Sequence, residues 1–498
     1  MLIKSEPDQI QTFLTDASYL KGGTASSVLV PESAQEVSEI LSRATSERTP
    51  ITISGAGTGT VAGRVPFGGV VLATNRLNRI GDVVSSQSQP TVVAEAGVVL
   101  KDLQHTVEAQ SLFYPPNPTE TSCFIGGTVA TNASGSRTFK YGPTRNYVER
   151  LKIALATGEI IDLRRGEIFA SERHVDLPLP SGKRIQAALP SYNMPHVRKH
   201  ASGYYVAPGM DLVDLFIGSE GTLGVMLEAE LKLLSKPVGL LSGVVFFASQ
   251  QSLLSFVSAV RATSLETRAR FASVAVDARV LEYFDRESLR FLRQKYGSIP
   301  EQAVGAVFFE QELTPETEDA LMTAWLSLLE QHGALADDSW FATTEADQEK
   351  IREFRHQLPV LMNEWFSRYN QRKVSTDIAV PDEQFPGILQ FHEELLVNSG
   401  LRYTIFGHIG DNHVHVNILP RNDGEAAAAW KIYRAFIKRA VEVGGTVSAE
   451  HGIGKLKREY LLEMYGADHL GEMARLKKAF DPAGILGRGN MFAEDYLK

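Results

Sequence analysis

The stretch FGHIGDNHVHVN, residues 406–417, holds three of the twelve histidines of the chain, His408, His413 and His415. A Gly-Asp-Asn turn separates the first of them from the other two. Core histidines usually occur singly, and surface histidines have no reason to gather. Neutral imidazole binds divalent metals, and it also takes up and releases protons near neutral pH. The spacing therefore predicts a metal site or a proton-transfer site.

The composition of the chain limits how such a site is built. A single cysteine, Cys123, excludes a disulfide framework and a cysteine-rich zinc site, so histidine, aspartate or glutamate must hold any metal. The net charge of −9 argues against a nucleic-acid partner, because phosphate binding needs a basic surface. With 498 residues the chain is too long for one core, which indicates two or three domains.

The N-terminus, MLIKSEPDQIQTFL, lacks the apolar core of a signal peptide. The most apolar stretch, residues 239–248, is about half as long as a bilayer span requires. We therefore expect a cytoplasmic protein, and the sequence leaves peripheral membrane contact and a homodimer open.

A glycine-rich loop, SGAGTGTVAG at 54–63, follows the apolar segment ITI. Glycine lets a phosphate approach backbone N–H groups closely. Part of the loop matches the dinucleotide pattern G-x-G-x-x-A, but Pro66 and further glycines follow where that pattern needs a helix. The loop therefore predicts a phosphate cradle between two strands, and the alternative is a plain glycine-rich hairpin.

Two further stretches, 115–148 and 218–225, are also rich in glycine and hydroxyl side chains. Three such loops in one half of the chain indicate a large, extended ligand, and a flat cofactor in two parts would fit. Around them, the pattern predicts strand, helix and strand over 26–54, with Ser33 as the helix cap. Short strands are expected over 91–235, and longer helices mixed with strands over 236–440.

The three stretches share motifs with a known family. Gly55–Gly59 stands for its GGGTG loop, 126–135 for its GG-x-x-A-T-N-A-x-G, and 218–224 is its G-S-E-G-T-L-G unchanged. The chain thus resembles the vanillyl-alcohol-oxidase superfamily, and most closely its FAD-linked D-2-hydroxy-acid dehydrogenases, which act on D-lactate, glycolate or D-2-hydroxyglutarate. The tail departs from the family's FDPxGILNPGK, since Gly487 and Arg488 replace Asn and Pro and Asn490 stands where Lys would be.

The resemblance implies an α+β fold. A two-subdomain, PCMH-type FAD-binding domain is expected over 1–236, and an antiparallel-sheet α+β cap domain carrying substrate and metal groups over 237–450. A helical C-terminal tail, 451–498, would return to the flavin. FAD is the implied cofactor, with its pyrophosphate on 55–59. The residues expected at the cofactor are Ser54, Gly55, Ala56, Gly57, Thr58, Gly59, Pro116, Asn117, Thr119, Ser122, Gly126, Gly127, Ala130, Thr131, Asn132, Gly135, Gly142, Glu220 and Gly221.

The resemblance also implies a use for the histidines. The family's metal ligands correspond to His408, His415 and Glu450, the last from SAEHGIG at 448–454, and the adjacent His451 matches the catalytic base. Zinc is the usual metal, and manganese or iron would also suit two imidazoles and a carboxylate. His413 replaces the family's asparagine. It shares a strand face with His415, so it remains open whether it is a fourth ligand, a nearby proton donor or a surface residue.

A 2-hydroxy acid carries a carboxylate, which arginine binds with two parallel hydrogen bonds. By resemblance this arginine is Arg355, and a helix-surface salt bridge is its alternative role. Lys373 is a second substrate candidate, with Arg372 and Ser375 competing for its position. Asn417, at the end of the histidine motif, is a third. Asp377 is expected to be structural.

The implied reaction oxidises a D-2-hydroxy acid to the 2-oxo acid by hydride transfer to flavin N5, with the D-lactate or glycolate type favoured. A D-2-hydroxyglutarate dehydrogenase is an alternative, and so is a non-redox flavin enzyme such as an alkyl-glycerone-phosphate synthase. A non-catalytic assembly subunit is a third, and the sequence leaves the electron acceptor open.

Overall fold

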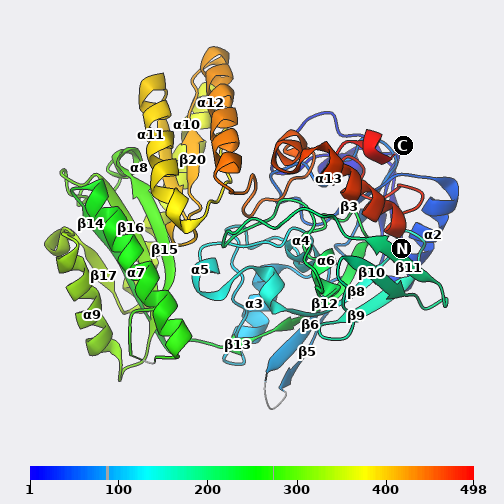
Figure 1. Cartoon of the computed structure of the whole chain (residues 1–498), viewed down its shortest axis with the longest axis horizontal. Coiled ribbons are helices and arrows are strands. Elements are labelled where there is room, and N and C mark those ends of the chain that lie inside the picture. Colours follow the sequence, from blue (N-terminus) through cyan, green and yellow to red (C-terminus); the bar gives the residue numbers. More distant parts are fainter. Residues whose placement is uncertain (86–88, 273, 498) are drawn as a thin grey trace.

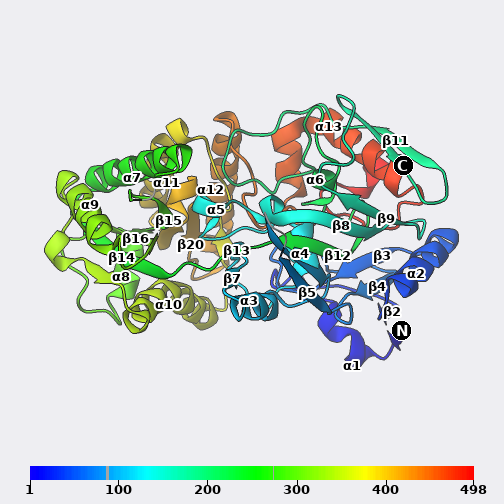
Figure 2. The same ribbon diagram turned by 90° about the horizontal axis from the view of Figure 1, so that it is seen from below.

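The computed structural model describes residues 1–85, 89–272 and 274–497. Figures 1 and 2 show two halves side by side. One half holds the N-terminal part of the chain together with the C-terminal tail, and the other holds the segments between them. The expected fold class is confirmed: two sheets and their helices form the first half, and an antiparallel sheet with helices forms the second. The division at 236/237 and at 450/451 stays a prediction.

A four-stranded sheet opens the first half, in the order β1-β2-β4-β3. Strands β2, β4 and β3 are parallel, and β1 is antiparallel to β2. The expected helix, α2 (Ala34–Glu47), begins where the side chain of Ser33 accepts the backbone N–H of Glu36, and it buries its apolar stripe against this sheet. The strands are β1 (Leu2–Lys4), β2 (Ser27–Val30), β3 (Ile51–Ser54) and β4 (Val70–Ala73).

A five-stranded antiparallel sheet, β5-β6-β12-β8-β9, completes the first half. Its strands are β5 (Ile80–Ser85), β6 (Pro90–Glu95), β8 (Val148–Ala154), β9 (Ile160–Arg164) and β12 (Val225–Lys232). Two small two-stranded antiparallel sheets flank it, β7 (Leu112–Phe113) with β13 (Leu234–Ser235), and β10 (His174–Pro178) with β11 (Arg184–Ala188). The helices are α1 (Pro7–Ile10), α3 (Leu100–Glu108), α4 (Ile125–Ala130), α5 (Thr138–Tyr141) and α6 (Val213–Phe216).

The second half is built on a seven-stranded sheet, β17-β14-β16-β15-β19-β20-β18, whose neighbouring strands are all antiparallel. Its strands are β14 (Gly239–Phe247), β15 (Ala278–Asp285), β16 (Gly305–Leu313), β17 (Trp340–Ala342), β18 (Val374–Ser375), β19 (Tyr403–Gly407) and β20 (His415–Ile418). Its helices are α7 (Gln250–Arg270), α8 (Arg286–Leu292), α9 (Glu318–Gln331), α10 (Glu345–Tyr369), α11 (Phe385–Ser399) and α12 (Asp423–Glu442).

Helices cover both faces of this sheet (Figure 2). Alternate residues of its central strands pack with α7 and α9 on one face and with α8 and α10 on the other. Runs such as GVVFF in β14 are therefore apolar at every position, because neither face meets water. The ring of Trp325 in α9 stacks on Phe309 of β16 at 3.8 Å between centroids.

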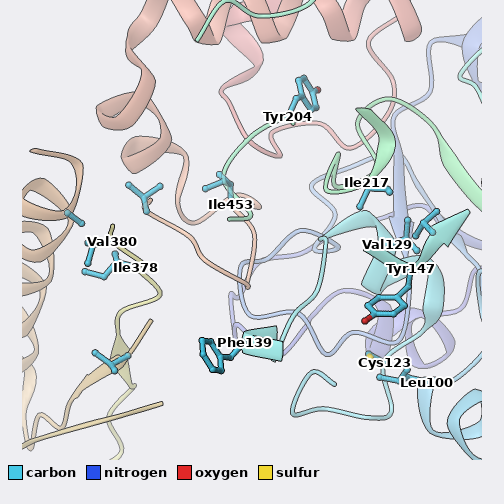
Figure 3. Close-up of a cluster of buried hydrophobic side chains, with 14 of the residues drawn as sticks. Leu100, Cys123, Val129, Phe139, Tyr147, Tyr204, Ile217, Ile378, Val380 and Ile453 are labelled. Atoms are coloured by element: carbon cyan, nitrogen blue, oxygen red, sulfur yellow. The ribbon is translucent and has the colours of Figure 1, made fainter. Parts of the chain in front are cut away.

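One apolar core joins the two halves. Figure 3 shows members from the first half, such as Val129 and Tyr147, and members from the second, such as Ile378 and Val380. Ile453, from the segment that leads into the tail, belongs to the same cluster. Burial of shared apolar surface therefore holds the two halves against each other.

The tail returns to the first half through α13 (Arg458–Phe480), which bends at Gly466. Beyond it, the backbone N–H of Ile51 in β3 bonds the carbonyl of Ile485. Within the described part of the chain, no helix is long and apolar enough to cross a bilayer.

A buried ion pair fixes this returning tail. The ammonium of Lys477, 1% exposed, donates to Asp481 at 2.7 Å and to the carbonyls of Thr222 and Leu486 at 2.9 and 2.8 Å. Asp481 also accepts the backbone N–H groups of Ile485 and Leu486.

We expect Lys477→Met to lower the free energy of unfolding by about 3–5 kcal/mol, because it leaves the carboxylate of Asp481 buried without its cation. Urea denaturation followed by circular dichroism measures the change. Lys478→Met is the control, since that neighbouring side chain is exposed. Equal stabilities of the two variants would contradict the role given to Lys477.

Candidate functional site

A cavity of about 360 Å³ lies in the first half, between the two sheets and the returning tail. It brings together the three glycine-rich stretches, which are far apart in the sequence. The expected cofactor residues that line it are Gly55, Ala56, Gly57, Thr58, Gly59, Thr119, Gly126, Gly127, Ala130, Thr131, Glu220 and Gly221.

Other expected cofactor residues lie outside the cavity lining and contact the loops that form it. Ser54 accepts a hydrogen bond from Arg64, and Asn132 accepts the backbone N–H of Arg145. Gly135 passes so close to another loop that a Cβ would lie 1.9 Å from the carbonyl oxygen of Asn117. Outside the cavity lining lie Ser54, Pro116, Asn117, Ser122, Asn132, Gly135 and Gly142.

The cavity walls fit FAD. Within the described residues, the backbone N–H groups of 56–60 donate no hydrogen bond to the protein, so they are free for phosphate oxygens. A Cβ on Gly59 or Gly127 would meet no atom within 4 Å, so both glycines face open space. The loop connects β3 to β4 without opening a helix, as the sequence predicted.

Sequence reasoning missed several residues at this cavity. The guanidinium of Arg64 lies against Gly57 and donates to Ser54 and to the carbonyl of Gly55, which places a positive charge beside the phosphate loop. No motif marks Arg64. Asn490, from the stretch where the tail departs from the family pattern, also lines the cavity and donates to the carbonyl of Glu220 at 3.2 Å.

Glu220 ties the cavity to the segment that carries the expected catalytic residues. Its carboxylate accepts the backbone N–H groups of Ile453 and Gly454 at 2.6 and 2.7 Å. Burial raises its pKa to about 7 even though these hydrogen bonds act in the opposite direction. Glu450 and His451 consequently stand in the wall of the same cavity.

The three histidines of the opening motif surround Glu450. Nε2 of His408 lies 3.4 Å from Oε2 of Glu450, and Nε2 of His415 lies 3.3 Å from Oε1. Nδ1 of His413 is 3.9 Å from Oε2. Ligand atoms of all four residues lie within 4.8 Å of one another.

Each imidazole has a protein oxygen close to the ring nitrogen that points away from Glu450. Nδ1 of His408 is 2.5 Å from Oε1 of Glu282, and Nδ1 of His415 is 3.0 Å from the carbonyl of Thr376. Nε2 of His413 is 3.2 Å from Oδ1 of Asp377. Such partners fix the orientation of histidines that bind metals, and here they leave the other nitrogen of each ring facing Glu450. The donor set therefore fits a divalent cation.

The charges around this group support the same assignment. Burial would lower the pKa of His408, but the carboxylate of Glu282 outweighs it and raises the pKa to about 9. Burial lowers the pKa of His413 to about 3 and also lowers that of His415. Burial of His413 excludes the alternative that it is a surface residue.

Asp377 organises the other side of the site. Its Oδ2 accepts hydrogen bonds from Ser448 Oγ and Lys457 Nζ, both at 2.6 Å, and from the backbone N–H of His451. Nδ1 of His451 lies 3.3 Å from the same oxygen. The imidazole of His451 is 34% exposed, so it is held by a carboxylate and still open to the cavity.

The expected substrate residues lie around this group. Arg355, on α10, donates from Nε and Nη2 to Oε2 of Glu282 at 3.2 and 3.1 Å, so its partner is a buried carboxylate of the sheet and not one on its helix surface. Asn417 is buried on β20, and its Oδ1 has no hydrogen-bond partner within the described structure. The side chain of Lys373 is exposed at the start of β18.

Sequence reasoning also missed Glu282 and Lys199. Glu282 interrupts the apolar run of β15, and a carboxylate in the middle of a strand that is buried at every position is a signal that could have revealed it. Lys199, fully buried, donates to Glu450 at 3.0 Å and to the carbonyl of Gly135. No pattern in the sequence marks it.

Two family models match successive parts of the chain. The family model described as FAD binding domain matches residues 25–164, and the one described as FAD linked oxidases, C-terminal domain, matches residues 248–491.

Curated relatives match along nearly the whole chain. The glycolate oxidase subunit GlcD of Bacillus subtilis is 29% identical and covers 95% of this chain and 90% of its own. A D-lactate dehydrogenase of Anaerostipes hadrus is 29% identical, covering 97% and 92%. A D-2-hydroxyglutarate dehydrogenase of Xanthomonas citri pv. viticola is 27% identical, covering 98% and 94%.

Among solved structures, an alkyldihydroxyacetonephosphate synthase superposes with a TM-score of 0.67 at 17% identity, covering 97% of this chain and 81% of its own. That likeness shows a shared fold alone. The matched families, the relatives and the glycine-lined cavity agree: the chain belongs to the FAD-linked oxidases of the vanillyl-alcohol-oxidase superfamily and is an FAD-linked oxidoreductase.

Proposed function

We propose that the protein oxidises a D-2-hydroxy acid to the 2-oxo acid, with FAD as oxidant and a divalent metal as Lewis acid. One observation carries the proposal: Glu450 and His451 line the FAD cavity, while Glu450 also stands among the three histidines. Metal candidates, a histidine base and the cofactor cavity therefore meet along one wall. The names of the relatives, which include glycolate, D-lactate and D-2-hydroxyglutarate enzymes, support this class of substrate.

We assign the metal to His408, His415 and Glu450. Zinc suits two imidazoles and a carboxylate, and manganese or iron also fits. When bound, FAD would accept two electrons from the substrate, and the metal would acidify the hydroxyl group that is being oxidised. His413, in the same ring, is the candidate for a fourth ligand.

The side chains of the protein have two further roles, which are to accept the substrate proton and to bind the substrate carboxylate. Asp377 beside Nδ1 of His451 favours the tautomer that keeps a proton on Nδ1, which leaves Nε2 free to take the hydroxyl proton. Arg355 offers a guanidinium to the substrate carboxylate, with Lys373 and Asn417 as further polar contacts. Glu282 holds Arg355 and His408 together, so the carboxylate anchor and the metal site are fixed to one another.

The cofactor assignment predicts the effect of filling the cavity. Gly127→Val is expected to weaken FAD binding about tenfold or more, since steric overlap costs about 1–3 kcal/mol. Fluorescence titration of the apoprotein with FAD measures it. Gly387→Val is the matched control, because it is also a helical glycine with no atom within 4 Å of an added Cβ, but it is exposed on α11. Equal affinities in the two variants would contradict the assignment.

The metal assignment predicts that His408→Ala, His415→Ala and Glu450→Ala each lose metal but keep FAD. The loss in affinity should exceed the about 10–100-fold that removal of an outer partner costs. Elemental analysis and metal titration measure it, with the exposed His105→Ala as control. We expect a smaller loss in His413→Asn. A loss equal to the others would add His413 to the ligands, and active wild-type enzyme without metal would overturn the assignment.

His451→Asn should slow flavin reduction by about 10²–10⁴-fold, the usual contribution of a general base, while FAD and metal contents stay normal. Anaerobic rapid mixing with glycolate, D-lactate and D-2-hydroxyglutarate measures the rate by the loss of flavin colour.

The control is His469→Asn, since His469 is 34% exposed and lies 3.0 Å from Glu472, outside the site. A reduction rate in His451→Asn close to that of wild type would exclude the base role. If none of the acids bleaches wild-type flavin, the proposed reaction itself is wrong.

A further inference from the structure

A group of three arginines lies beside the proposed site. Arg137 comes three residues after Ser134. The hydroxyl of Ser134 donates to Glu450 at 3.4 Å. Arg279 stands on β15 three residues before Glu282, and Arg355 on α10 binds Glu282. The arginine cluster, Arg137, Arg279 and Arg355, thus lies at the border between the two halves of the protein, where burial and the charges of Arg279 and Arg355 all lower the pKa of Arg137.

The ring of Phe113, in β7, joins two members of the cluster. The guanidinium carbon of Arg137 lies 5.1 Å from the centre of this ring, and that of Arg279 lies 5.4 Å from it. One ring therefore holds an arginine of the first half and an arginine of the second half close together.

The carboxylates near the cluster are already engaged. Glu282 binds Arg355 and also faces His408. Nε of Arg279 lies 3.3 Å from Oε2 of Glu310, which makes an ion pair but no hydrogen bond within the described structure. The guanidinium of Arg137 forms no ion pair or hydrogen bond among the described residues, and its polar partner is the face of Phe113.

This arrangement is costly without an anion. Burial, and after it the charge of Arg279, lowers the pKa of Arg137 to about 9. A largely desolvated guanidinium without a carboxylate partner is unfavourable, and a second guanidinium beside it adds repulsion. An anion held between Arg137 and Arg279 would remove both penalties, and planar guanidinium groups bind carboxylates with paired hydrogen bonds.

We infer that Arg137 and Arg279 bind a second carboxylate of the substrate, so that the enzyme acts on dicarboxylic 2-hydroxy acids in preference to glycolate or D-lactate. The inference rests on the proposed function and refines it. The first carboxylate and the hydroxyl group are assigned to the metal and Arg355, which leaves Arg137 and Arg279 for the far end of the molecule. Glycolate and lactate carry no charged group there.

The test compares substrates in wild type and in Arg137→Met. Wild type should show a higher kcat/KM for D-2-hydroxyglutarate than for D-lactate. Arg137→Met should lower kcat/KM for D-2-hydroxyglutarate about 10–100-fold, the usual effect of losing a hydrogen bond to a charged group, and leave D-lactate within about twofold. The kcat/KM of Arg137→Lys for D-2-hydroxyglutarate should lie between those of wild type and Arg137→Met. Lysine keeps the positive charge but cannot form the paired hydrogen bonds of a guanidinium.

Arg270→Met is the control, because Arg270 lies on the exposed end of α7 and pairs with Glu266 there. A wild-type preference for D-lactate would overturn the inference, and so would an equal loss of both activities in Arg137→Met. Phosphate is tested as an inhibitor of both reactions. Equal inhibition of both, seen only when Arg137 is present, would mean that the cluster binds a free anion, and it would overturn the inference as well.

A binding measurement separates this inference from the proposed reaction. Glutarate, which has no hydroxyl group to oxidise, should perturb the flavin spectrum of wild type and bind about tenfold more weakly to Arg137→Met. That difference supports the subsite even if no 2-hydroxy acid reduces the flavin. Unchanged glutarate binding in Arg137→Met overturns the subsite whether or not the enzyme turns over.

Discussion

The site depends on one buried carboxylate, that of Asp377, which is 1% exposed. It accepts hydrogen bonds from Ser448 and Lys457 and from the backbone at Glu450 and His451. These donors all come from one segment, while Asp377 itself follows β18 of the seven-stranded sheet. His451 and then the ammonium of Lys457 hold the pKa of Asp377 well below its usual range in spite of its burial. An ionised carboxylate buried this deeply is unfavourable without such donors, so these contacts fix the position of the segment against the sheet.

Glu220 holds the same segment to the flavin half. Its carboxylate accepts two backbone N–H groups just beyond His451, and a Cβ on Gly452 would lie 2.8 Å from its Oε1. Gly452, with φ of +80°, therefore suits both the backbone conformation and the close approach. Asp377 from the second half and Glu220 from the first half both accept backbone N–H groups at His451 or within three residues of it. The proposed metal ligand and the proposed base thus take their positions from both halves of the molecule at once.

Local patterns in the sequence predicted the features that depend on residues near one another in the chain. The helix over 34–47 follows from its cap and its apolar spacing, and the glycine loops follow from the need for close backbone approach. The metal candidates His408, His415 and Glu450 came from family motifs, and the structure places them together. Lys199 and Arg64 could not be found in this way, because their roles depend on contacts across long stretches of chain. Lys199 and Glu450, for example, are separated by 251 residues.

The protein oxygens that contact the imidazoles show how the fold orients the histidines of the motif. Glu282 is on β15, Thr376 and Asp377 follow β18, and each faces the nitrogen of one histidine that points away from Glu450. Their strands occupy separate positions in the sheet, so the sheet determines which nitrogen of each ring is free. Glu282 extends this control to Arg355, and Lys199 adds a positive charge next to Glu450. A change in the order or register of these strands would therefore disturb the ligand set and the proposed carboxylate anchor together, even with every motif residue in place.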